Sequence, residues 1–70
     1  MEPRYVVGSN IRALRKARGM TQEGLAGGAG MDAAEIGRVE RGTREAGIRT
    51  LLRIARALEV KVSELLRGLD

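Results

Sequence analysis

The chain has 70 residues, enough for one small domain that buries about 60% of its unfolded surface and offers no catalytic cleft between subdomains. It contains no cysteine and no histidine, which excludes disulfides, thiolate metal sites and the side chain best suited to acid–base catalysis near neutral pH. Thirteen basic and nine acidic residues give a net charge of +4, which suits a nucleic-acid partner. We therefore expect no enzyme activity, no catalytic residues, no cofactor and no metal.

No apolar run approaches the roughly 20 residues of a membrane span, and the N-terminal segment MEPRYVVGSN is too polar for a signal peptide. We expect a soluble cytoplasmic protein that forms a single domain over residues 1–70, without a membrane partner or a small-molecule ligand. Because Tyr5 is the only aromatic residue, the core must be built from aliphatic side chains, which suits packed helices better than a sheet.

The first expected helix runs from about Val7 to Arg18. Val7, Ile11 and Leu14 recur at helical spacing and form an apolar stripe. Gly19 can end this helix as a left-handed cap, and Met20 supplies the apolar contact beyond the cap.

The second expected helix, Gln22–Ala29, follows Thr21, a residue that favours the N-cap position. It contains three glycines, each of which costs about 1 kcal/mol relative to alanine inside a helix. The glycines are either tolerated in a locally weak helix that packing holds together, or they let the backbone approach a phosphate closely. They are Gly24, Gly27 and Gly28.

The third expected helix opens at Asp32, and a glutamate three residues later completes a capping-box pattern. Ile36 and Val39 face inward, and Gly42 closes the helix. Gly30 allows a left-handed backbone, which lets the third helix leave the second at a steep angle.

Residues 21–41 therefore predict a helix-turn-helix, a unit that places its second helix in the major groove of DNA. The face of the third helix opposite the core is expected to be open. It carries Ala33, Ala34, Gly37, Arg38 and Arg41.

After a loop over residues 43–47, two more helices are expected, Ile48–Leu58 and about Val62–Arg67, the latter ending before Gly68. Leu52 lies off the apolar stripe of the fourth helix. With five helical segments and no strand pattern, the fold class is all-α, a compact five-helix bundle.

Three segments together resemble the Cro/C1-type (XRE-like) helix-turn-helix family of DNA-binding regulators: NIRALRKARGMTQEGLA, AGMDAAEIGRVERGTRE and TLLRIARALEVKVSELL. The resemblance covers about residues 8–67 and implies a lambda-repressor-like domain. Within the family, a bare domain of this length looks most like restriction–modification controller proteins and small phage repressors, which are homodimers that bind two-fold symmetric operators in double-stranded DNA.

The resemblance also implies roles for individual residues. Contacts to a phosphate at the start of the second helix are expected from Thr21 and Gln22. Positions facing base edges are Asp32, Ala33, Ala34 and Arg38. Backbone contacts after the third helix are expected from Arg41, Thr43 and Arg44. A structural ion pair is expected between Arg15 and Glu40. The dimer interface is expected to include Leu52, Val60, Val62 and Leu66.

The base-facing positions depart from the family's usual pattern. Ala33 and Ala34 can touch only a thymine methyl, so Arg38 is the one strong candidate for bidentate recognition of guanine. Residues 21–47 carry three basic and five acidic side chains, so the basic excess lies outside the recognition element. We expect phosphate contacts and DNA shape to supply part of the specificity.

Two alternatives stand beside the leading hypothesis of a homodimeric, sequence-specific transcriptional regulator. One is an antitoxin-type protein that also binds a cognate protein, which the glycine-rich second helix and Leu52 suggest. The other is an interaction module with weak DNA binding, which the two alanines and the acidic central segment suggest.

Overall fold

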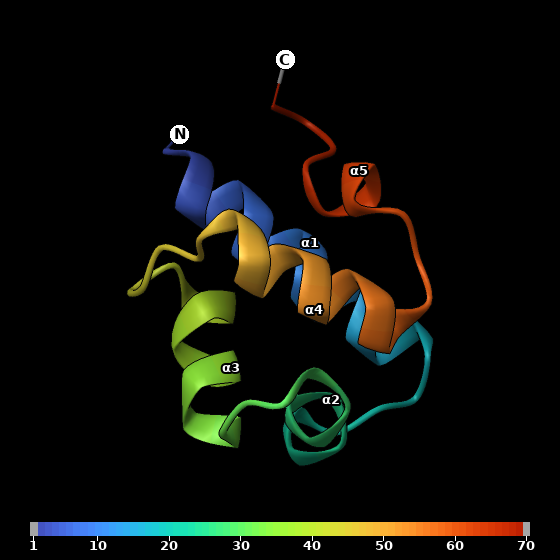
Figure 1. Cartoon of the computed structure of the whole chain (residues 1–70). Helices are drawn as coiled ribbons and strands as arrows, with labels where there is room; N and C mark the ends of the chain where they lie inside the picture. The colour runs from blue at the N-terminus through green and yellow to red at the C-terminus, as the bar shows by residue number, and fades with distance from the viewer. Residues whose placement is uncertain (1, 70) are drawn as a thin grey trace.

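Five helices follow one another along residues 2–69, the part of the chain that the computed structural model describes (Figure 1). α2 packs against both α3 and α4, while α1 packs against α3 and α5 and the two chain ends lie on the same side of the molecule. The helices are α1 (Pro3–Ala17), α2 (Gln22–Ala29), α3 (Ala33–Arg41), α4 (Ile48–Leu58) and α5 (Val62–Leu65).

Every helix contributes at least one fully buried aliphatic side chain to a single core. Aliphatic burial of this kind supplies most of the driving force for folding. The largest fully buried side chains are Ile11, Leu25, Ile36, Ile54, Leu58 and Leu65.

The first helix starts earlier than the sequence pattern predicts, at Pro3 instead of Val7. Proline suits the first turn of a helix because its φ angle is already helical and the N–H it lacks would have no partner there. The added turn places the Tyr5 ring against Gly42, the residue that ends α3.

Gly8 lies where α1 meets α3. A Cβ atom at this position would collide with the backbone carbonyl oxygens of Val39 and Glu40. The two helices therefore approach so closely that only glycine fits between them, a constraint that the apolar stripe of α1 does not reveal.

The last helix is shorter than expected and ends at Leu65 instead of Arg67. The side chain of Asn10 explains how this end is held. Its amide nitrogen donates hydrogen bonds to the carbonyl oxygens of Leu65 at 2.9 Å and Arg67 at 2.8 Å. These bonds satisfy carbonyls that a continued helix would otherwise pair.

Gly27 and Gly28, two of the three glycines of α2, differ in their surroundings. A Cβ atom on Gly28 would lie 3.1 Å from the Cβ of Ala57 in α4, so close packing accounts for this residue. A Cβ atom on Gly27 would meet nothing within 4 Å. Packing therefore requires a small residue at one of these two positions and not at the other.

Within residues 2–69, no helix is both long enough and apolar enough to cross a membrane. The same residues contain no group of three or more acidic side chains placed to hold a metal ion.

Candidate nucleic-acid interface

α2 and α3 form a helix-turn-helix whose bend is at Gly30. This residue has a φ angle of 68°, in the left-handed region that glycine adopts without strain. The Thr21 hydroxyl caps α2 by accepting a hydrogen bond from the N–H of Gly24 at 2.9 Å. These local features set the direction of both helices before tertiary contacts are considered.

One side of α3 is open, and it forms the reading face, which we define as Ala34, Arg38 and Arg41. These residues follow i, i+4, i+7 spacing, so they line one stripe of the helix. Among the described residues, neither arginine has a carboxylate within ion-pair distance. Two guanidinium groups are thus available to an external anion.

Two residues expected on the open face lie elsewhere. Gly37 is buried because the side chains of Arg41 and Gln22 lie over it. A Cβ atom at this position would lie 3.1 Å from a guanidinium nitrogen of Arg41 and 3.6 Å from the amide nitrogen of Gln22. Ala33 is half-buried and packs against the hydrophobic core. The open stripe is therefore narrower than the sequence predicts, since the side chains of Arg41 and Gln22 cover Gly37.

The start of α3 is held by Glu35. Its carboxylate oxygen Oε1 accepts a hydrogen bond from the backbone N–H of Asp32 at 3.1 Å, and its second oxygen, Oε2, lies 2.9 Å from Nη1 of Arg44. The bond from Asp32, and then the nearby charge of Arg44, lower the pKa of Glu35 below the ordinary glutamate value. Glu35 is therefore ionised at neutral pH and carries a negative charge beside the reading face.

The loop after α3 is tied back to the helix by three hydrogen bonds to one carbonyl. The backbone N–H groups of Thr43 and Arg44 donate to the carbonyl oxygen of Arg38 at 3.0 and 3.3 Å. The Thr43 hydroxyl donates to the same oxygen at 3.1 Å. Thr43 thus ties the loop to the end of α3. It is exposed, as are its neighbours Arg41 and Arg44.

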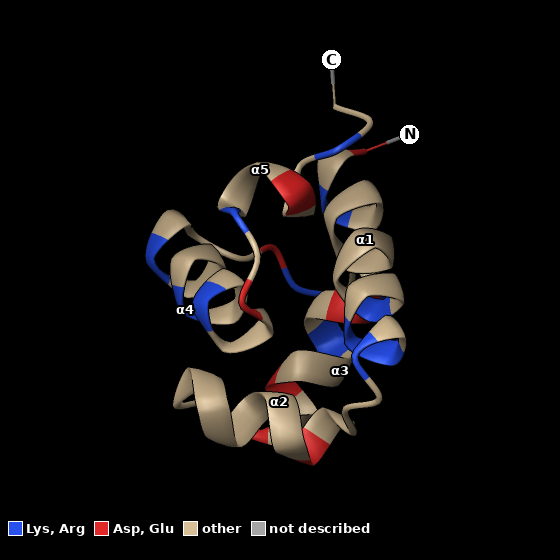
Figure 2. Ribbon diagram, turned by 90° about the vertical axis from the view of Figure 1, so that its right-hand side faces the viewer, with Lys and Arg blue, Asp and Glu red and all other residues tan. Residues whose placement is uncertain are grey.

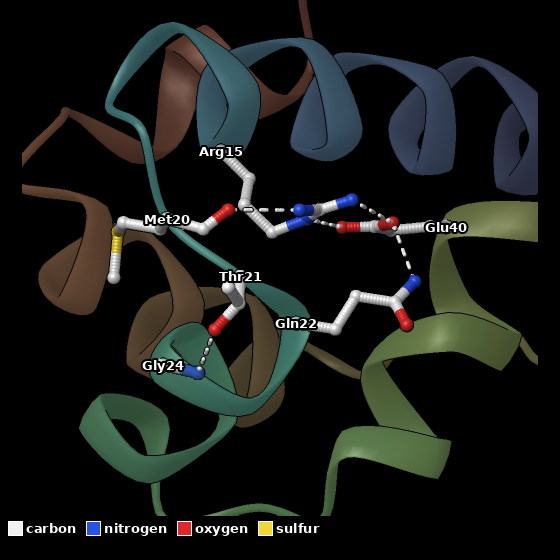
Figure 3. Close-up of polar contacts among 6 residues, drawn as sticks. All are labelled: Arg15, Met20, Thr21, Gln22, Gly24 and Glu40. Carbon is white, nitrogen blue, oxygen red and sulfur yellow. Dashed lines mark hydrogen bonds and ion pairs between the residues drawn. The ribbon is translucent and has the colours of Figure 1, made fainter.

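A buried polar cluster joins α1, α2 and α3 (Figure 3). Nε and Nη2 of Arg15 lie 2.6 and 3.1 Å from the two carboxylate oxygens of Glu40, a bidentate pair. Nη1 of Arg15 also donates to the carbonyl oxygen of Met20 at 2.8 Å. The hydrogen bond to Glu40 raises the pKa of Arg15 above its ordinary value, so the pair stays charged.

Gln22 belongs to this cluster as well. Its amide nitrogen donates to Oε1 of Glu40 at 3.1 Å. The sequence indicates Gln22 as a phosphate contact, but in this structure its side chain is half-buried and engaged inside the protein. Seven of the nine residues expected at the DNA are exposed, and Gln22 and Ala33 are the two that are not.

The distribution of charge is uneven (Figure 2). α4 and α1 carry basic residues on opposite sides of the molecule, whereas α2 has Glu23 as its one charged residue. Because Glu40 is paired with Arg15 from α1, the formal charge of residues 21–47 overstates the negative potential at the helix-turn-helix. The three outward arginines of α4 are Arg49, Arg53 and Arg56.

The residues expected at a dimer interface fall into two groups. Leu52 and Leu66 are 47% and 38% exposed, whereas Val60 and Val62 are partly buried and pack against the core. Ile48, which was not among the residues expected at the interface, is 77% exposed one helical turn before Leu52. The i, i+4 spacing of these two residues was the signal that could have found it.

A cavity of about 160 Å³ lies beside this apolar surface, between α1, the start of α4 and the C-terminal turn. Leu51, Leu66 and Leu69 line one side of it, and Arg4 and Arg44 also reach it. Exposed leucines and the cavity thus lie close together at this part of the described surface.

A family model described as Helix-turn-helix matches residues 11–65. The chain belongs to this family. The HTH-type transcriptional regulator y4dJ of Sinorhizobium fredii is 37% identical over 70 residues, which cover all of this chain and 91% of the relative. Control protein C.SmaI of Serratia marcescens is 35% identical over 66 residues, covering 94% of this chain and 79% of the relative.

Solved structures of helix-turn-helix proteins have the same fold. The restriction–modification controller protein C.AhdI of Aeromonas hydrophila superposes with a TM-score of 0.87 at 39% identity, covering 89% of this chain and 94% of that one. The predicted family and the predicted five-helix, all-α fold are therefore confirmed, and the relatives are transcriptional regulators and controller proteins, as expected.

Proposed function

We propose that this helix-turn-helix protein is a sequence-specific, DNA-binding transcriptional regulator that acts as a homodimer on a two-fold symmetric operator. The observation that carries the proposal is the reading face of α3, where two arginines have no acidic partner among the described residues. Arginine recognises guanine through a bidentate pair of hydrogen bonds and phosphate through the same planar fork.

Within this proposal, Arg38 reads a base, and the residues after α3 contact the sugar–phosphate backbone. Arg41, Thr43 and Arg44 lie at the C-terminal end of α3 and in the loop that follows it. Thr21 lies at the start of α2, where backbone N–H groups favour a phosphate, and Asp32 lies at the start of α3 among the positions expected to face base edges. The similarity to C.SmaI and C.AhdI supports a restriction–modification controller as the specific type.

The proposal is tested by selecting bound fragments from a random DNA library and measuring retardation of the selected sequence in gels. Arg38→Ala is expected to weaken operator binding by about 1–3 kcal/mol per half-site and to flatten the preference at one base position of each half-site. Arg56→Ala is the matched control, because this exposed arginine lies at the end of α4 remote from α3 (Figure 1).

Two outcomes would contradict the proposal in different ways. If the Arg38→Ala protein keeps the same base preference, Arg38 does not recognise a base. The complete lack of retardation by the unmodified protein at low salt removes DNA binding itself and favours an interaction module instead.

A further inference from the structure

We propose that Glu35 limits the affinity for operator DNA by acting as an internal substitute for a DNA phosphate. It holds Arg44 in the free protein and yields it only when the operator sequence fixes the register of the complex. This inference rests on the proposed function, since it needs a DNA phosphate as the competitor.

The geometry of the Glu35–Arg44 pair is that of a site already filled. Oε2 of Glu35 lies 2.9 Å from Nη1 of Arg44, and Oε1 is fixed by the N–H of Asp32 at 3.1 Å. Both carboxylate oxygens are therefore engaged, and the Glu35 side chain is 27% exposed. A guanidinium group binds a carboxylate and a phosphate through the same charge-assisted hydrogen bonds, so a phosphate competes with Glu35 directly.

Arg44 has an acidic partner, unlike the two arginines before it in the sequence. Arg38 and Arg41 have no carboxylate within ion-pair distance among residues 2–69, although all three arginines lie on or just after α3. The backbone of Arg44 is also held, because its N–H donates to the carbonyl oxygen of Arg38 at 3.3 Å. The side chain can thus change partner while the loop keeps its place.

The competition lowers operator affinity most, because the Glu35–Arg44 pair is broken only in the operator complex. Non-specific binding depends on phosphate contacts alone, and without base contacts the protein has no fixed register on the duplex. A loosely placed phosphate competes poorly with a carboxylate that is already in position. On the operator, base contacts through Arg38 hold one phosphate close to Arg44, so the exchange of partners follows.

The test compares Glu35→Gln with the unmodified protein on operator and on random duplex DNA over a range of salt concentrations. Glutamine keeps an oxygen that can accept the N–H of Asp32 but has no charge to hold Arg44. We expect operator affinity to rise about 3-fold, because the pair no longer has to be broken there. Non-specific affinity should rise less, with its salt dependence steepening by up to about one phosphate contact. Thermal unfolding of both proteins checks that the fold is kept.

Two controls separate competition for Arg44 from a general effect of charge. Glu64→Gln removes a carboxylate that lies 3.0 Å from Arg67 in a similar exposed pair, far from α3 in the sequence. It should leave both affinities unchanged. In an Arg44→Ala background, Glu35→Gln should lose most of its effect, because there is no side chain left to release.

Three results would overturn this inference. One is unchanged operator affinity in Glu35→Gln, and another is a rise on random DNA that equals or exceeds the rise on the operator. The third is a rise of the same size in the Arg44→Ala background, which would mean that Glu35 acts by repulsion alone. A failure of the unmodified protein to bind any DNA is a distinct result, because it rejects the proposed function first and leaves Glu35 without a competitor.

Discussion

Glu40 is a buried carboxylate that joins three helices. It accepts hydrogen bonds from Arg15 and Gln22, so one carboxylate connects α1, the start of α2 and the end of α3. Its side chain is 2% exposed and that of Arg15 is 10% exposed. A charge buried to this extent is tolerated only because a partner of opposite charge neutralises it. The cluster therefore sets how the helix-turn-helix sits on α1.

Removing the Glu40 carboxylate should destabilise the protein strongly. Glu40→Ala leaves the Arg15 guanidinium buried without a counter-charge, and we expect the free energy of unfolding to fall by about 3 kcal/mol. That is a large share of the total for a domain of this size. Urea denaturation measures the change. Glu64→Ala, which breaks an exposed pair, should cost less than about 1 kcal/mol, and a similar loss in both variants would contradict the assigned role of the cluster.

At the scale of elements, the glycines show that the same residue type can have different structural roles in different helices. Gly8 lies where α1 touches the backbone of α3, and Gly28 lies against Ala57 of α4. Gly27 is exposed and meets nothing. The same residue type thus allows two helices to approach in one place and merely weakens a helix in another.

Alanine substitutions at two of these glycines should have opposite effects on stability. Gly8→Ala forces α1 away from the carbonyls of Val39 and Glu40 and should cost about 1–3 kcal/mol, as overpacking does. Gly27→Ala should add up to about 1 kcal/mol, because alanine favours the helix and no neighbour obstructs its Cβ. Thermal or urea unfolding of both variants provides the measurement. Destabilisation by Gly27→Ala would mean that α2 requires this glycine for a reason that packing does not explain.

The helix boundaries show where signals from neighbouring residues are sufficient to predict the start or end of a helix. Thr21, Gly30 and the spacing of Ile36 and Val39 predict α2 and α3 at their observed bounds. Pro3 is a local signal for the early start of α1, although the spacing of apolar residues does not predict that start. The early end of α5 has none, because Asn10 lies 55 residues away from Leu65 in the sequence.

At the scale of the whole molecule, the reading face and the largest exposed aliphatic side chains lie on different helices. The reading face lies on α3, while exposed aliphatic residues lie on α4 and in the C-terminal turn. A small domain cannot bury every apolar side chain, so single exposed residues are ordinary. Here Ile48 and Leu52 are adjacent on one helix, and a cavity lined by Leu66 and Leu69 lies nearby, which favours an interface between copies of the chain.

Leu52→Glu should therefore convert the proposed homodimer to a monomer. Two copies of a buried glutamate would face each other across a two-fold interface, and like charges without partners are costly there. Size-exclusion chromatography with light scattering gives the mass directly. Ala13→Glu, on the exposed side of α1, is the matched control and should leave the mass unchanged. A Leu52→Glu protein that remains a dimer would place the interface elsewhere.

The sequence by itself determined the family, the five helices and the inward-facing residues, because helical spacing, caps and turn glycines are properties of residues close together in the chain. Tertiary structure alone decided that Gln22 binds Glu40, that Gly37 is covered, and that Glu35 holds Arg44. The Gln22–Glu40 bond joins residues 18 positions apart on α2 and α3, so it depends on how these two helices pack. The Glu35–Arg44 pair joins residues 9 positions apart and depends on how the loop after α3 folds back. The open surface available to DNA therefore follows from packing as well as from the residues of α3.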